Sequence, residues 1–110
     1  MTYNKQGQPG FREIRNRLME SLEAGEYQSA VRGGETEQKN YLAVGKLKVA
    51  ELIEILMACK GDEHTCSPHH QDPGLLVHVF KPVHKGRRWY IKVYFEEEQA
   101  IFLSTHEAGD

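Results

Sequence analysis

The sequence of 110 residues lacks several features that would identify a class of protein at once. No apolar run approaches the roughly 18 residues that span a bilayer, and the first ten residues lack the apolar stretch of a secretory signal. There is no P-loop, no G-x-G-x-x-G and no G-x-S-x-G, so nucleotide-cofactor and α/β-hydrolase sites have no sequence support. With only two cysteines, Cys59 and Cys66, and no export signal, we expect reduced thiols in a cytoplasmic protein.

The net charge of −2 alone argues against a nucleic-acid-binding protein, but the charges are sorted along the chain. Between residues 74 and 95 there are five cations and no acid. Between residues 96 and 110 there are five acids and no lysine or arginine. A local basic surface is therefore compatible with the acidic total.

Two segments have the hydrophobic spacing of amphipathic helices. In residues 10–24 apolar side chains recur every three or four positions, and Gly25 supplies a C-terminal stop. A second stripe predicts a helix from about residue 47 to residue 59; it consists of Val49, Leu52, Ile53, Leu56 and Met57. Residues 25–40 are a polar connector, with a short strand or turn near Tyr27 to Val31.

After residue 74 the period changes from that of helices to that of strands. We expect strands at residues 75–80, 89–95 and 100–104, whereas residues 60–74 have no periodicity and contain two prolines, as loops do. Because the links between these strands are short, successive strands form hairpins and give a three-stranded antiparallel meander. The predicted fold class is α+β, with two amphipathic helices packed on one face of this C-terminal meander.

The middle strand places aromatic and cationic side chains on the face that the helices leave open. In residues 89–95 the apolar side chains alternate with Tyr90, Lys92 and Tyr94. The adjoining hairpin adds a cluster of cationic and imidazole side chains: Lys81, His84, Lys85, Arg87 and Arg88. Cations beside exposed rings suit single-stranded RNA, because phosphates attract positive charge and unstacked bases stack on rings. A solvated sheet face with a basic hairpin fits the composition equally well.

His106, near the chain end, is a candidate for proton transfer. It follows the last predicted strand, whose antiparallel register would place the imidazole beside Tyr90 or Lys92. RNA cleavage by the internal 2′-hydroxyl needs a proton acceptor, a proton donor and cations for the crowded phosphorane. Histidine titrates near neutrality and can fill either proton role. The alternative is an exposed histidine in a tail.

The order of these segments resembles the MqsR-like mRNA interferase toxins of the RelE-like superfamily. The matching pieces are an aliphatic helix, a loop serine, an aromatic-Lys-Pro strand end, a Tyr-Ile-Lys strand and a closing Ser-x-His-Glu: residues 52–56, Ser67, 79–82, 89–93 and 104–107. Tyr90 falls on the family's active-site tyrosine, and His106 falls where the family has a basic residue. Thr105 stands where a phenylalanine is usual, residues 64–66 replace a stretch with a lysine, and a family glutamine is replaced around residues 77 and 78.

The resemblance implies a RelE-like fold and a metal-independent mRNA endoribonuclease without a cofactor, the toxin of a type II toxin–antitoxin pair. Tyr90 would position or polarise the scissile phosphate, His106 would act as general acid or base, and Lys92 would bind the RNA backbone. His64 or His78 would substitute for the absent lysine. The partners would be mRNA, bound by the hairpin cluster, and a cognate antitoxin protein. We expect one domain at residues 11–107, between a flexible lead-in (1–10) and a tail (108–110).

The segment after the second helix permits a different hypothesis, a zinc site. It contains several soft ligand side chains: Cys59, His64, Cys66, His69 and His70. Their spacing matches no standard C-x2-C or H-x3-H pattern. A polar loop whose histidines touch phosphate is the simpler interpretation.

A third hypothesis is a non-catalytic module of the same fold, whose sheet face binds protein rather than RNA. The two kinds of binding differ in their response to salt. RNA binding through five cations should weaken steeply as salt rises, whereas an apolar protein interface should not. An exposed edge strand also leaves homodimer formation open.

Overall fold

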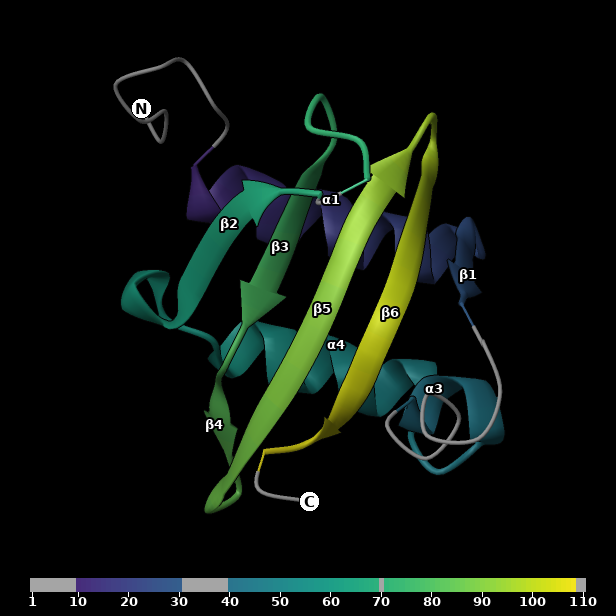
Figure 1. Cartoon of the computed structure of the whole chain (residues 1–110). Coiled ribbons are helices and arrows are strands. Elements are labelled where there is room, and N and C mark those ends of the chain that lie inside the picture. Colours follow the sequence, from purple (N-terminus) through teal and green to yellow (C-terminus); the bar gives the residue numbers. More distant parts are fainter. Residues whose placement is uncertain (1–9, 31–39, 70, 109–110) are drawn as a thin grey trace.

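The computed structural model describes residues 10–30, 40–69 and 71–108, which form an α+β domain (Figure 1). The helices are α1 (Phe11–Ala24), α3 (Tyr41–Val44) and α4 (Val49–Ala58), with a 3-10 turn at Gly61–Glu63. The strands are β1 (Tyr27–Ser29), β2 (His64–Pro68), β3 (Leu76–Phe80), β4 (Val83–His84), β5 (Arg87–Glu96) and β6 (Gln99–Glu107). Parts of the sequence predictions lie outside the described residues: residues 1–9 of the lead-in, Val31, His70 and residues 109–110 of the tail.

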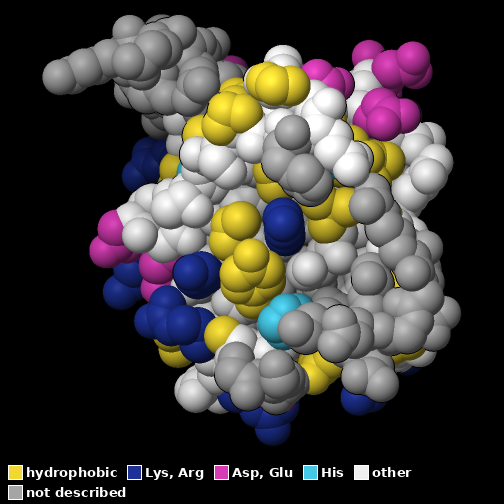
Figure 2. All heavy atoms as spheres, viewed as in Figure 1, with side chains coloured by type: hydrophobic (Ala, Val, Ile, Leu, Met, Phe, Trp, Pro, Cys, Tyr) yellow, Lys and Arg dark blue, Asp and Glu magenta, His cyan; other side chains and the backbone are white. Residues whose placement is uncertain are grey.

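The described strands form one mixed sheet in the order β1-β6-β5-β3-β2, and β4 pairs with the start of β5. Because β3, β5 and β6 are antiparallel neighbours, the predicted meander is confirmed. The sheet is wider than that meander, since β1 joins β6 in parallel and β2 joins β3 in antiparallel orientation. Helices α1 and α4 lie behind the sheet in Figure 1, so the opposite face is the one that Figure 2 shows.

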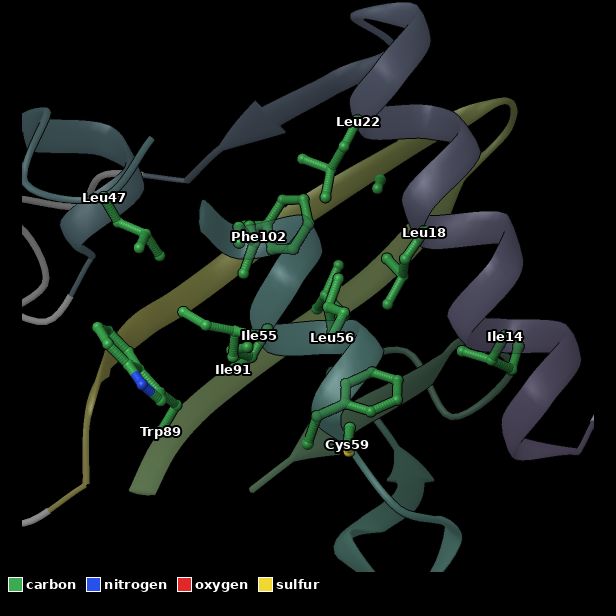
Figure 3. Packing of buried hydrophobic residues seen from close by; sticks show 14 residues of the cluster. Ile14, Leu18, Leu22, Leu47, Ile55, Leu56, Cys59, Trp89, Ile91 and Phe102 are labelled. Carbon is green, nitrogen blue, oxygen red and sulfur yellow. The ribbon is translucent and has the colours of Figure 1, made fainter. Parts of the chain in front are cut away.

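The core lies between the sheet and helices α1 and α4, as the helix stripes predict. Leu18 of α1, Leu52 of α4 and Phe102 of β6 are fully buried. In Figure 3 leucine and isoleucine side chains of both helices point towards Ile91 and Phe102. Truncating a leucine in such a core to alanine costs about 2–5 kcal/mol. Among the described residues, no helix combines the length and apolar character needed to cross a bilayer.

The end of α1 follows the sequence signal. Gly25 caps the helix in the left-handed conformation, at φ 75°, which glycine adopts without a steric penalty. The chain then enters β1, whose three residues lie within the segment for which a short strand or turn was predicted. The first helix and its stop are therefore confirmed.

The predicted loop at residues 60–74 is wrong over its first half. Residues 61–63 form the 3-10 turn, and β2 then pairs with β3, from His64 opposite Phe80 to Pro68 opposite Leu76. As an edge strand β2 is largely exposed, so its sequence has no need of apolar alternation. Pairing with a distant strand, which local periodicity cannot reveal, makes this segment extended.

The last strand is longer than predicted. It continues beyond Ser104 to Glu107, so that Tyr90 lies opposite His106 and Trp89 lies opposite Glu107. A shift in register separates the Val93–Phe102 pair from the Lys92–Ser104 pair. His106 is thus part of the sheet and does not belong to a tail.

A buried polar link joins β6 to α3, a short helix that the sequence did not predict. Thr105 and Asn40 are both fully buried. The Thr105 hydroxyl donates to Asn40 Oδ1 (2.9 Å) and accepts from the backbone N–H of Leu42 (2.9 Å). Asn40 Nδ2 donates in turn to the carbonyl oxygen of Phe102 (3.1 Å). These bonds fix the segment of β6 that carries His106.

Candidate functional site

Three side chains of β5 project from the sheet face that α1 and α4 leave open, which we call the outer face. Trp89, Ile91 and Val93 belong to the core, and strand alternation therefore turns Tyr90, Lys92 and Tyr94 outward. All three are partly exposed. The predicted alternation of this strand is confirmed.

Tyr90 and His106 form a stacked pair on the outer face. Their ring centroids are 5.3 Å apart and the ring planes differ by 25°. Nδ1 of His106 lies 2.8 Å from the carbonyl oxygen of Glu107. A carbonyl oxygen only accepts hydrogen bonds, so Nδ1 carries the proton and Nε2 of the neutral ring holds the lone pair. This tautomer makes His106 a proton acceptor at Nε2.

Positive charge lies beside this pair. The Nζ atom of Lys81 is 5.8 Å from the centre of the Tyr90 ring, and Arg88 Nη1 donates to the carbonyl oxygen of Lys81 (2.6 Å). Lys92 is the next outward residue of β5 and lies opposite Ser104. Among the described residues neither lysine has an acidic partner within ion-pair distance. Their charges are therefore available to a phosphate.

Three residues of the predicted RNA-binding cluster lie away from this pair. Arg87 forms an ion pair with Glu107 (2.8 Å), and both belong to the strand positions that face the helix side. The Nε2 atom of His84 is 3.7 Å from the Glu54 carboxylate of α4. Lys85 occupies the turn between β4 and β5 with a φ of 53°. Of that cluster, only Lys81 contacts the Tyr90 ring, because Arg88 binds the Lys81 carbonyl oxygen and lies 3.7 Å from the Glu63 carboxylate.

His64, predicted to substitute for a catalytic lysine, lies on the opposite face of the sheet. It is the pairing partner of Phe80, a core residue, and its ring stacks on Phe80 at a centroid distance of 4.6 Å. Its Nε2 atom is 3.0 Å from Nδ1 of His78, within hydrogen-bond distance. Strand alternation thus separates His64 from Tyr90 and His106, so the structure does not bring His64 together with the rest of the predicted catalytic group.

Burial favours the neutral form of the two inner histidines, because it lowers the pKa of each. Burial lowers the pKa of His64. Burial lowers the pKa of His78 to about 4, and the neighbouring His64 and Arg17 add to the effect. A neutral, hydrogen-bonded and stacked pair beside Phe80 and Phe11 is a packing element of the fold.

The zinc hypothesis finds no ligand cluster in the described part of the chain. No three His, Cys, Asp or Glu side chains gather there as metal ligands. Burial, with Glu63 nearby, raises the pKa of the Cys59 thiol to about 12, whereas zinc binds the thiolate. His70, the remaining candidate, lies outside the described residues.

Two features of the site were not predicted from the sequence. One is the Glu107 carbonyl oxygen that fixes the His106 tautomer, which no side-chain pattern encodes. The other is Val77 and Ile101, which flank Tyr94 on the outer face. Applying the alternation of β5 to its two neighbouring strands could have found this second feature.

Comparisons of the chain with protein-family models, with curated proteins and with solved structures give no match. A functional assignment therefore rests on the chemistry of the outer face.

Proposed function

We propose that this protein is a metal-independent mRNA endoribonuclease with a RelE-like fold, the toxin of a type II toxin–antitoxin pair of the MqsR-like kind. The observation that carries the proposal is the stacked Tyr90–His106 pair beside Lys81 and Lys92. It supplies a proton acceptor in His106, which is only 9% exposed, a partly exposed phenol, and two lysines without an acidic partner among the described residues. These are the groups that cleavage through the 2′-hydroxyl requires.

The proposed reaction is an internal transesterification. Nε2 of His106 takes the proton of the 2′-hydroxyl, the O2′–P bond forms and the P–O5′ bond breaks. The departing 5′ oxygen takes a proton from solvent, and His106 later returns its proton to solvent. The products are a 2′,3′-cyclic phosphate and a 5′-hydroxyl, and neither an oxidant nor a co-substrate is needed.

The cations and the phenol act on the phosphate. Lys92 and Lys81 stabilise the extra negative charge of the phosphorane, and this electrostatic term is commonly the largest in such reactions. The Tyr90 hydroxyl donates a hydrogen bond to a phosphate oxygen and orients it for attack. Stacking on His106 holds the phenol and the imidazole in one fixed relation.

The test is cleavage of RNA by the purified protein, together with growth and mRNA integrity on induction of the chain alone. Tyr90→Phe and His106→Ala should abolish or strongly reduce cleavage, and His78→Asn, on the other face, serves as the matched histidine control. Products should end in a 2′,3′-cyclic phosphate, and a 2′-deoxy nucleotide at the cut should block the reaction. Intact RNA with the folded wild-type protein overturns the proposal.

A non-catalytic protein-binding module is the second candidate, favoured by two observations. Strand β2 is an edge of the described sheet and is largely exposed. Met57 and Val83 are 59% and 43% exposed, on elements that pack against each other. This candidate predicts a stable complex with a protein in the absence of nucleic acid, with weak dependence on salt.

A further inference from the structure

A row of apolar side chains crosses the outer face at Tyr94. Tyr94 lies between Val77 of β3 and Ile101 of β6 in the strand register. Both neighbours are buried, at 4% and 8% exposure, yet neither belongs to the main core cluster of the described residues. The partly exposed Tyr94 side chain therefore lies between two buried apolar side chains that are separate from the main core cluster.

His69 supports this ring from the side. The two rings meet edge to face, with centroids 5.9 Å apart and planes at 73°. The backbone N–H of His69 donates to Leu75 (2.8 Å) and its carbonyl oxygen accepts from Asp72 (3.2 Å). These bonds fix the position of His69, so the Tyr94 ring is held in place before any ligand arrives.

The charges along β5 change sign just beyond Tyr94. Lys92 precedes it on the same face, whereas the turn to β6 carries Glu96, Glu97 and Glu98. Together with Glu26 this turn lines a shallow cavity of about 370 Å³. Figure 2 shows hydrophobic side chains beside cations and a histidine in the middle of the face, and acids at its upper right and left margins. A polyanion would therefore follow the face from the lysines to Tyr94 and no further.

We propose that Tyr94 is a stacking platform for one nucleobase of a single-stranded RNA whose phosphate lies at Tyr90 and His106. The inference rests on the proposed function and adds a second subsite to it. Four residues of strand separate the two tyrosines by about 13 Å. A stacked strand advances roughly 3.4 Å per nucleotide, so the base lies up to about four nucleotides from the cut, and fewer where the strand is stretched.

The first test uses single-stranded oligodeoxynucleotides two to six nucleotides long, which bind but cannot be cut through a 2′-hydroxyl. Fluorescence anisotropy should show a step of about tenfold in affinity at the length that reaches Tyr94. Tyr94→Leu should remove this step and leave the affinity of the shortest oligomers unchanged. Tyr94→Phe, the matched control, should keep the step because it retains the ring. A step that survives in Tyr94→Leu overturns the proposal, as does a wild-type series without a step.

The second test separates this inference from the proposed function. With RNA substrates of the same lengths, Tyr94→Leu should raise KM about tenfold for the long substrates and leave kcat unchanged. Cleavage with the same KM in both proteins contradicts the platform but not the endoribonuclease. A ring-dependent step in oligonucleotide binding without any cleavage contradicts the endoribonuclease but not the platform. Thermal melting of each variant checks that it is folded.

Discussion

The two faces of the sheet each carry a stacked ring pair that contains a histidine, His64–His78 on the helix side and Tyr90–His106 on the outer side. The pairs have nearly the same geometry, with centroids 5.2 Å and 5.3 Å apart and planes at 27° and 25°. Their surroundings differ. The inner pair is hydrogen-bonded to itself and lies against Phe80. The outer pair lies beside lysines, and one His106 nitrogen bonds to the backbone.

The difference shows what makes a histidine available for chemistry. In the inner pair each ring uses a nitrogen to satisfy the other ring, and burial holds both neutral. In the outer pair the backbone satisfies Nδ1, which leaves Nε2 as the acceptor for a substrate proton. A stacked histidine therefore has a structural role on one face and a proposed chemical role on the other.

The largest expected effect is the loss of RNA cleavage in His106→Ala. Removing a general base should lower kcat about 10²- to 10⁴-fold. The same experiment with His78→Asn should leave kcat within a few-fold of wild type at a temperature where the variant is folded, because His78 is on the other face. Single-turnover cleavage of a fluorescent RNA measures both. Equal losses in the two variants would remove the functional contrast between the pairs.

The next effect concerns acid stability and belongs to the inner pair. The folded-state pKa of His78 is about 4 and that of an unfolded histidine is about 6.5, so below pH 6.5 the unfolded chain binds more protons. The stability that the neutral His78 contributes should be complete above pH 6.5. The free energy of unfolding should then fall by about 3 kcal/mol as the pH drops to 4. Urea unfolding at a series of pH values measures this slope.

A variant without the titrating ring isolates the contribution of His78. His78→Asn should be less stable than wild type at pH 7 but should lose less stability between pH 6.5 and pH 4. Subtracting the two curves removes the carboxylates that titrate in the same range, since they are common to both proteins. Parallel curves in the two proteins would contradict the assignment of a neutral, buried His78.

The sequence predicted the parts of the fold that carry their own periodicity. The stripe at residues 49–57 and the alternation at residues 89–95 are local, and both elements form as expected. The polar strand β2 and the parallel strand β1 depend on partners far along the chain. Local periodicity cannot distinguish such strands from loops, which explains the error at residues 60–74.

The candidate site was predictable to the same extent. Short hairpin links predicted the antiparallel order of β5 and β6, and of the two expected partners, Tyr90 and Lys92, the structure places Tyr90 opposite His106. Assigning His64 to the same site failed because β2 had no predicted register, and one residue of register decides which face a side chain occupies. The position of Lys81 over the Tyr90 ring depends on the path of the chain after β3, which the sequence does not reveal.

A smaller effect, on stability, is expected at Thr105, which precedes His106 in β6 and faces the helix side. Thr105→Val keeps the shape but leaves Asn40 Oδ1 and the Leu42 N–H without the hydroxyl, and both are hydrogen-bonded to it now. Asn40 Oδ1 keeps the Ala43 N–H as a donor at 3.4 Å, but the Leu42 N–H loses its acceptor, which should lower the free energy of unfolding by about 2 kcal/mol. Thr105→Ser keeps the hydroxyl and should lose less. Chemical denaturation measures the free energy of unfolding of the two variants. Equal losses of stability would mean that the hydrogen bonds of the hydroxyl contribute nothing and that only packing matters at this position.

The smallest effect distinguishes the cations of the outer face from those of the hairpin. Lys92 has no acidic partner among the described residues, whereas Arg87 is already neutralised by Glu107. Removing one cation that binds a phosphate of a single strand should reduce the slope of log K against log salt by about 0.7. Lys92→Ala should show this reduction for a single-stranded oligonucleotide, and Arg87→Ala should leave the slope nearly unchanged. An equal reduction in both would mean that bound RNA displaces Glu107 from Arg87, which would extend the binding surface from the outer face to the hairpin.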